Sequence, residues 1–405
     1  MVLERKEKKI VINAINNLGR RVSAADIASK TGLPLASATL ALNQIAAETS
    51  GHMQVSKAGD IAYQFPIAYQ SAYISHGVRR FFEQFLVRAL EIGFFLLRIS
   101  FGIMLILSLL SIVLIFFVIM SARSQSRDND DFAIDLDFFD WMILRDLLFW
   151  QLDDLSYGYT DQRDNKPTNF LYNCFSFLFG DGNPNRDLDE RRWQMIANLI
   201  RQKKAVVTTE QLAPYIGNDP SDEDAVLPVL VRFDGRPAVT ESGNIVYLFP
   251  SLQAQAAGNI SNSLPPYLNI FRWQFSKVEQ TSLIWVVLLA AVNFFGSWYL
   301  YISAAQYSTL AFLSPLLTVL VAYGTLFIAI PFARYISICL INQRIVKGNQ
   351  LRESYARLLS HPEQRLINKL NEAKEMAVAA RPIDDVVYDT NKDILEQEFP
   401  TISNS

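Results

Sequence analysis

Three long stretches without a formal charge constrain this chain more than any other feature. They cover residues 99–120, 282–305 and 309–333. Each is long enough to cross the apolar core of a bilayer, which takes about 20 residues in an α-helix. Because no water is present there to bind backbone amides, such a segment must be helical. The sequence therefore predicts a mainly α membrane protein with about three transmembrane helices.

A second feature is a pattern that occurs twice, before the first apolar stretch and between it and the next two. One copy ends with GDIAYQFP at Gly59–Pro66, and the other with GNIVYLFP at Gly243–Pro250. Further upstream, the residues at 22–28 and Gly32 match those at 207–213 and Gly217. Recurrence in the same order indicates an internal duplication rather than chance similarity. We expect two related small domains, at 1–70 and 187–252.

The first copy has the plan of a small α+β winged-helix domain. Apolar residues recur at helical spacing over 5–18, and Ser23 with Asp26 forms the capping box of a second helix. A third helix covers 35–48, after the stop at Gly32. Alternating apolar and polar residues over 53–65 predict the hairpin that makes the wing.

The second copy repeats these parts. It has a first helix over 193–200, a capping box at 208–211 and a turn at Gly217. A third helix begins at 221–224, and the wing covers 238–249. Two winged-helix-like domains on a membrane protein suggest docking and assembly more than chemistry.

The charges of these domains disfavour nucleic acid as a partner. A winged helix that binds DNA needs cations on its third helix and along the phosphates. Residues 35–47 contain no Lys or Arg, and the second copy carries Asp219, Asp222, Glu223 and Asp224 in the corresponding region. We therefore expect protein partners and membrane lipid.

Positive charges near the apolar stretches predict the topology. Arg334, Arg344 and Lys347 follow the last stretch, which places the C-terminus on the cytoplasmic side. The uncharged connection at 304–309 then lies on the opposite side. Arg79 and Arg80 favour a cytoplasmic first domain too, yet one crossing separates the two small domains. The side of the first domain stays open.

The segments between these parts have their own predictions. Residues 71–98 are expected to form an amphipathic interfacial helix, with an extra crossing as the alternative. Residues 121–186 form an acidic, aromatic linker with an apolar run at 170–179, and 253–281 form a second linker. Two polar helices are expected within 334–380, separated at Ser360–Pro362. The last residues, 381–405, are expected to be a mobile tail.

No cluster of residues specifies a reaction, so we expect no enzyme, no cofactor and no metal. The aspartates over 128–137 offer oxygen ligands but lack the spacing of a calcium loop. The three histidines are far apart in sequence, and no phosphate-binding glycine loop is present. Cys174 and Cys339 are too few for a four-cysteine cluster site within one chain.

Six aromatic residues are candidates for docking a partner. Four lie in the two wings and two in the acidic linker: Tyr63, Phe65, Tyr247, Phe249, Trp141 and Trp150. The alternative for the wing residues is that they fill the domain cores.

The wing signature and the order of domains and spans resemble a poorly characterised group of membrane proteins from cyanobacteria and plant plastids. The resemblance covers most of the chain, and it implies a cytoplasmic or thylakoid membrane. Some plastid members are labelled as iron–sulfur assembly proteins. The two cysteines of this chain are too few for a cluster-scaffold site, so they give that label little support. The sequence predicts a non-enzymatic scaffold or assembly factor. The alternatives are a membrane-tethered DNA-binding regulator and a transporter or channel subunit.

Overall fold

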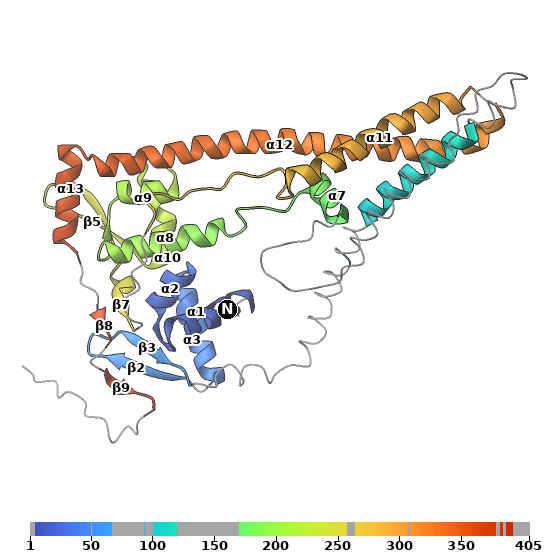
Figure 1. Cartoon of the computed structure of the whole chain (residues 1–405). Helices are drawn as coiled ribbons and strands as arrows, with labels where there is room; N and C mark the ends of the chain where they lie inside the picture. Colours follow the sequence, from blue (N-terminus) through green and yellow to red (C-terminus); the bar gives the residue numbers. More distant parts are fainter. Residues whose placement is uncertain are drawn as a thin grey trace, which may run out of the picture. The chain divides into compact units, whose positions relative to one another are not determined.

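A computed structural model of the chain describes residues 5–49, 51–66, 93, 100–119, 170–256, 264–306, 308–377, 381–383 and 386–391. The described chain is mainly helical, with three small sheets (Figure 1). It divides into two compact units. The first contains Met1–Arg79, Asn185–Phe271 and Arg344–Ser405, and the second contains Arg80–Pro184 and Arg272–Gln343.

The N-terminal small fold of the first unit has three helices and a three-stranded antiparallel arrangement. Its elements are α1 (Arg5–Leu18), β1 (Arg21–Ser23), α2 (Ala24–Thr31), α3 (Leu35–Thr49), β2 (His52–Ser56) and β3 (Ile61–Gln64). Strand β3 lies between β1 and β2, and Tyr63 pairs with both Val22 and Met53. Side chains without exposed surface, such as Ile15 and Leu42, fill the core.

The second small fold has its elements in nearly the same order. They are α8 (Leu188–Gln202), β4 (Val206–Val207), α9 (Thr209–Ile216), η1 (Glu223–Val226), α10 (Leu227–Phe233), β5 (Arg236–Val239), β6 (Ile245–Leu248), η2 (Pro250–Gln253) and β7 (Ala254–Gln255). Strand β6 is central, and Tyr247 pairs with both Val207 and Pro237. The sheet order β4-β6-β5 thus parallels β1-β3-β2 of the N-terminal fold.

Both predicted capping boxes are present. The Ser23 side chain accepts from the backbone of Asp26, and in the second box the backbone amide of Thr208 donates to Gln211 Oε1 at 3.2 Å. The helices α2 and α9 end at Gly32 and Gly217, where φ is 73° and 88°. Glycine suits these positions because a Cβ makes positive φ unfavourable.

The helix that follows the last apolar stretch differs from the prediction. A single helix, α12 (Ser314–Ser360), includes most of the expected span at 309–333 and the polar helix expected after it, and the start of that span lies in η3 (Ser308–Leu313). No helix-breaking residue separates the two parts between Arg334 and Asn342. The predicted break at Ser360–Pro362 is confirmed, since the next helix is α13 (Gln364–Glu375).

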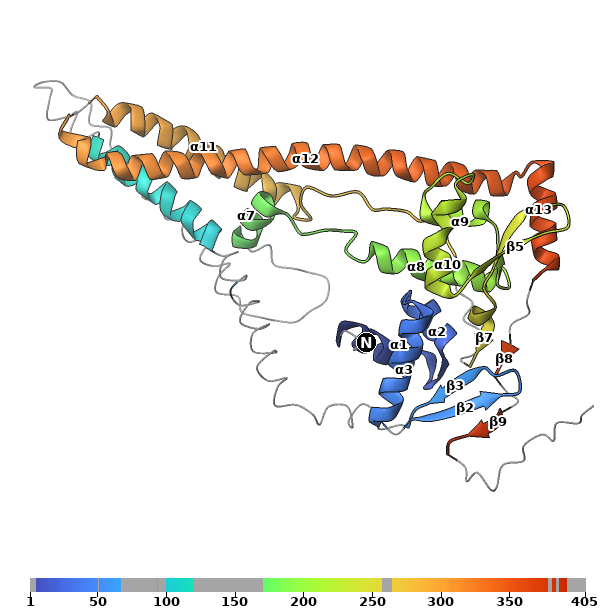
Figure 2. The same cartoon turned by 180° about the vertical axis from the view of Figure 1, so that it is seen from behind.

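Part of the expected mobile tail is structured. Residues beyond α13 form β8 (Arg381–Pro382) and β9 (Val386–Asp389). Strand β8 pairs with β7, and β9 pairs with β2 of the N-terminal fold, as Figure 2 shows from behind. The predictions for 71–98 (apart from Gly93), for 121–169 and for 392–405 lie outside the described residues.

The second unit contains the apolar helices. Among the described residues, three helices are long and apolar enough to cross a membrane: Ser100–Ile119, α11 (Gln280–Ala304) and Ala311–Ser360, which contains α12. Helix α7 (Phe170–Phe179) packs among them, with Cys174 and Phe177 in one cluster with Leu105, Val286 and Phe327.

A small polar group lies between these helices. Asn293 and Ser297 of α11 have no exposed surface, and Asn293 Nδ2 donates to Ser108 Oγ. A Cβ on Gly324 of α12 would lie 2.8 Å from Asn293 Oδ1. The three helices therefore approach closely at small and polar residues, a common way of packing helices in lipid.

Candidate functional site

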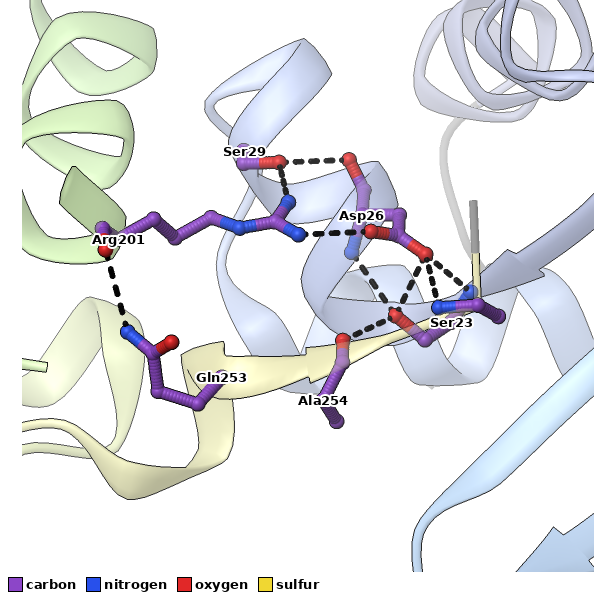
Figure 3. Close-up of polar contacts among 7 residues, drawn as sticks. Ser23, Asp26, Ser29, Arg201, Gln253 and Ala254 are labelled. Atoms are coloured by element: carbon purple, nitrogen blue, oxygen red, sulfur yellow. Dashed lines mark hydrogen bonds and ion pairs between the residues drawn. The ribbon is translucent and has the colours of Figure 1, made fainter. Parts of the chain in front are cut away.

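The two small folds meet at a carboxylate with no exposed surface. Asp26 of α2 is 0% exposed, and its Oδ1 lies 2.9 Å from Nη2 of Arg201 in α8 (Figure 3). The side chain of Arg201 is 10% exposed. A buried charge is costly unless it is paired and hydrogen-bonded. This contact therefore fixes which surfaces of the two folds face each other.

The second carboxylate oxygen of Asp26 binds the chain beyond β7. Oδ2 accepts from the backbone of Ser23 at 3.0 Å and of Ala256 at 2.9 Å. The Ser23 hydroxyl donates to the carbonyl oxygen of Ala254 at 2.7 Å. Residues 254–256 lie at the end of the second fold, so Asp26 joins α2 to both α8 and this end.

Arg201 is held on more than one side. Its Nη1 donates to Ser29 Oγ at 2.6 Å, one turn along α2 from Asp26 (Figure 3). Its backbone carbonyl oxygen accepts from Gln253 Nε2 at 3.4 Å. The guanidinium thus bridges two side chains of the N-terminal fold, a geometry that a lysine could not reproduce.

A second contact between the small folds involves Arg232 of α10. Its Nε donates to the carbonyl oxygen of Gly32 at 2.8 Å, and its Cζ lies 4.4 Å from the ring centre of Trp193. A Cβ on Gly32 would lie 2.9 Å from that of Trp193, so the position has no room for a side chain. Burial lowers the pKa of Arg232 from its ordinary value, and Asp189 and Glu7 act against that shift.

The four predicted docking aromatics of the wings lie in the cores. The exposed fractions are 1% for Tyr63, 4% for Phe65, 3% for Tyr247 and 0% for Phe249. Each comes from the central strand of its sheet or directly after it, where both faces are covered. These four side chains therefore fill the domain cores, which was the alternative interpretation of the sequence, and they are not available to a partner in this fold. Trp141 and Trp150 lie outside the described residues.

The C-terminal segment covers the second wing. The carboxylate of Glu372 in α13 binds the hairpin turn at Thr240 and Asn244, and Lys369 Nζ lies 2.9 Å from Glu210. Ala373 is buried against Val206 and Val246 of the sheet. Hydrogen bonds from Ser242, Thr240 and Asn244 lower the pKa of Glu372.

In the second unit, one arginine organises the end of the apolar helices. Arg334 of α12 donates to the carbonyl oxygens of Ser176, Phe177 and Phe275, and its Cζ lies 4.4 Å from the ring centre of Phe275. Asp181 binds the same region, accepting from the backbone of Lys277 at 2.6 Å. Burial acts to raise the pKa of Asp181. Its hydrogen bonds with the Lys277 backbone, Tyr172 and Ser176 outweigh burial and lower that pKa.

No group of three or more metal-ligating side chains occurs among the residues that the structure describes. The aspartates of 128–137 lie outside that part of the chain. Cys174 is buried, Cys339 is half-buried, and neither forms a disulfide. The sequence identified Asp26 only as a capping residue, and Arg201 had no signal at all, because the two lie 175 residues apart.

Comparison with known proteins gives one close relative to report. The chain is 35% identical, over 424 residues, to an Arabidopsis thaliana protein described as uncharacterized and chloroplastic, At5g03900. The match covers 97% of this chain and 80% of the plant protein. No protein-family model matches the chain, and no solved structure resembles it. A plastid relative agrees with the resemblance found in the sequence.

Replacing Asp26 by alanine tests the buried contact. The substitution leaves the guanidinium of Arg201 buried without its carboxylate, so we expect the free energy of unfolding to fall by about 3–5 kcal/mol. Urea unfolding in detergent, followed by tryptophan fluorescence, measures this change. As a control, Asp189→Ala removes a carboxylate that is 82% exposed and is expected to cost less than about 1 kcal/mol. Equal costs for the two variants would contradict the assignment.

The pH dependence of α13 tests the contact at the second wing. Because the folded-state pKa of Glu372 is lowered, its contribution is present above the ordinary value of 4.5 and is lost as the pH falls through the folded value. We expect hydrogen exchange of α13 amides to accelerate below that pH in the natural chain relative to Glu372→Gln. Glu375→Gln, at an exposed position of α13, should behave like the natural chain. A difference in α13 exchange rate between the natural chain and Glu372→Gln that stays the same at every pH would contradict this prediction.

Proposed function

We propose that this chain, which belongs to the family of the chloroplastic Arabidopsis thaliana protein At5g03900, is a membrane-anchored, non-enzymatic scaffold or assembly factor that docks protein partners. The two small folds of the first unit would form the docking body. The three apolar helices of the second unit would anchor it in a cytoplasmic or thylakoid membrane.

We propose further that the two small folds are duplicated winged-helix domains. The order of helices and strands supports this, because a three-helix stretch precedes a hairpin in each. The matching capping boxes and the glycines at Gly32 and Gly217 support it as well. The paired positions of Tyr63 and Tyr247 on the central strands place the two wing signatures in the same register.

One observation favours docking of proteins over binding of DNA. In a winged helix the third helix is the one that enters the major groove, and these helices, α3 and α10, contact each other. The cation of α10, Arg232, is engaged by Gly32 and Trp193. The third helices therefore serve the junction between the folds.

The surface that α10 leaves open suits a protein partner. Leu227 and Val231 lie one turn apart and are 53% and 86% exposed. The preceding residues, Asp222, Glu223 and Asp224, are exposed carboxylates that repel phosphate. Apolar side chains at an acidic rim are typical of protein contacts rather than nucleic-acid contacts.

The arrangement of the apolar helices supports a topology with both small folds on one side. At one end of the second unit, Leu105 packs with α7 and with Val286. At the other end, Ile119 packs with Leu300 and Leu317. Leu105 and α7 therefore lie at the same end of the helix cluster.

We propose that this end lies on the cytoplasmic side of the membrane, or on the corresponding side of a thylakoid, because its charges are positive. Arg272, Lys277 and Arg334 cluster there, and hydrogen bonds between Asn342 and the backbone of Trp273 join the same end. We propose that both small folds and the C-terminus lie on this cation-rich side.

Purification of the tagged protein from its native membrane tests the proposed function. After nuclease treatment in mild detergent, we expect membrane proteins to co-purify in a fixed ratio to the chain. Their recovery should fall several-fold with Asp26→Ala, because that change disturbs the arrangement of the two folds. Glu241→Gln, at an exposed position of the second hairpin turn, should recover them fully and serves as the matched control.

Recovery of the chain alone from the natural protein would overturn the proposal. The alternatives would then come first, each with its own signature. A DNA-binding regulator would bind DNA with an affinity that falls steeply with salt. A transporter or channel subunit would show conductance or stabilisation by its substrate.

A further inference from the structure

The outer edge of β2 in the N-terminal fold is filled by a strand from the far end of the chain. Strand β9 runs antiparallel to β2, with Gln54 opposite Asp389 and Val55 opposite Tyr388 (Figure 2). The backbone amide of Thr390 donates to the Met53 carbonyl oxygen at 3.0 Å. In return, Met53 N donates to the Thr390 hydroxyl at 2.8 Å. The edge therefore binds an extended segment mainly through its backbone.

Two polar side chains give this edge a preference for an acidic residue. Gln54 Nε2 donates to Asp389 Oδ2 at 2.9 Å, and Arg21 Nε donates to Gln54 Oε1 at 3.2 Å. The same arginine donates through Nη2 to the carbonyl oxygen of Ile383. The relay from Arg21 through Gln54 orients a donor toward the carboxylate. Replacing Asp389 by alanine would remove that acceptor and leave Gln64 Oε1, at 3.2 Å, as the acceptor for Gln54 Nε2.

Strand β9 is held lightly compared with the elements around it. None of residues 386–391 is buried, and Val386 is 37% exposed. The pairing with β2 is interrupted by a shift in register between Val55 and Ser56. Segments with little buried apolar surface open at low free-energy cost. An edge strand of this kind can be exchanged for another strand.

The second small fold lacks the same capacity at the corresponding edge. Strand β5 takes the place of β2, and Pro237 stands opposite Tyr247 as Met53 stands opposite Tyr63. Proline has no N–H, so it removes the donor that Met53 offers to Thr390. Among the described residues, no strand pairs with the outer edge of β5. The two folds therefore differ in their ability to accept a strand.

We propose that the outer edge of β2 is a docking site for an extended segment of a partner protein, with β9 as its resident occupant. The partner segment has the chemistry of Val387–Thr390: an aliphatic, an aromatic and an acidic residue, followed by Thr or Ser. It adds to β2 as a strand, a known mode of peptide recognition. This deepens the proposed function, on which it rests, by naming the surface that receives the partner.

Binding of a labelled peptide to the full-length protein in detergent tests the site. The peptide has the sequence of residues 386–391, VVYDTN, and fluorescence anisotropy measures its affinity. In the natural chain the linked β9 competes at an effective concentration in the millimolar range. The variant Tyr388→Pro disrupts β9 opposite Val55, and we expect it to bind the peptide at least about tenfold more tightly. Asp389→Ala in the chain provides a second, milder release of β9.

The natural difference between the two folds supplies the matched control. Adding Met53→Pro to Tyr388→Pro gives the β2 edge the proline of β5, so peptide binding should be lost. The β2–β3 pairing should persist, because the Met53 amide faces β9, and circular dichroism checks this. A peptide with the Asp389→Ala change should bind several-fold more weakly. Equal binding by the natural chain and both released variants, or by the two peptides, would overturn the proposal.

Competition during purification separates this inference from the proposed function. An excess of the peptide should reduce recovery of the membrane partners, while a scrambled peptide should not. Partners that co-purify and resist the peptide would sink the β2 site and leave the scaffold function standing. Absence of any partner would sink the function itself, whatever the peptide does.

Discussion

The ion pair between Asp26 and Arg201 is the interaction on which the arrangement of the first unit depends. Both side chains are almost withdrawn from solvent, and their contacts with each other, with Ser29 and with Ala256 join segments distant in sequence. Such a pair contributes specificity more than net stability, because desolvation offsets much of the attraction. Its main effect is to make other relative positions of the two small folds unfavourable, because sliding the folds apart would leave a buried charge unpaired. The junction of α3 and α10, and the position of residues 254–256, follow from that restriction.

The fixed arrangement explains why two similar folds are used differently. Their third helices contact each other, so in the proposed scaffold a partner would bind at the hairpins or at the exposed parts of α10. The C-terminal segment lies on both hairpins, through Glu372 at the second and through β9 at the first. The C-terminal segment is thus attached to the two hairpins differently: by a polar side-chain contact of α13 at the second, and by the edge strand β9 at the first. Pro237 marks the edge that accepts no strand, and Met53 the edge that does.

Local features of the fold were predictable from the sequence, and long-range ones were not. The capping boxes at Ser23 and Thr208, the stop glycines and the hairpins depend on residues a few positions apart. The three apolar helices follow from composition alone. Arg201 gave no signal, because its partner lies in another fold, and β9 looked like tail because edge strands need few apolar residues. The wing aromatics were ambiguous, since alternation predicts a buried face without saying which side chains fill it.

Sidedness of the two folds in sealed membrane vesicles tests the central claim most directly. Single cysteines would replace Asn17 in α1, Lys203 after α8 and Gln306 after α11, all exposed, with Cys174 and Cys339 changed to alanine. A membrane-impermeant thiol reagent then labels each from one side. The account predicts that positions 17 and 203 react from the same side and position 306 from the opposite side. Labelling of positions 17 and 203 from opposite sides would contradict it, because a hydrogen bond of 2.9 Å between Asp26 and Arg201 cannot form across a bilayer.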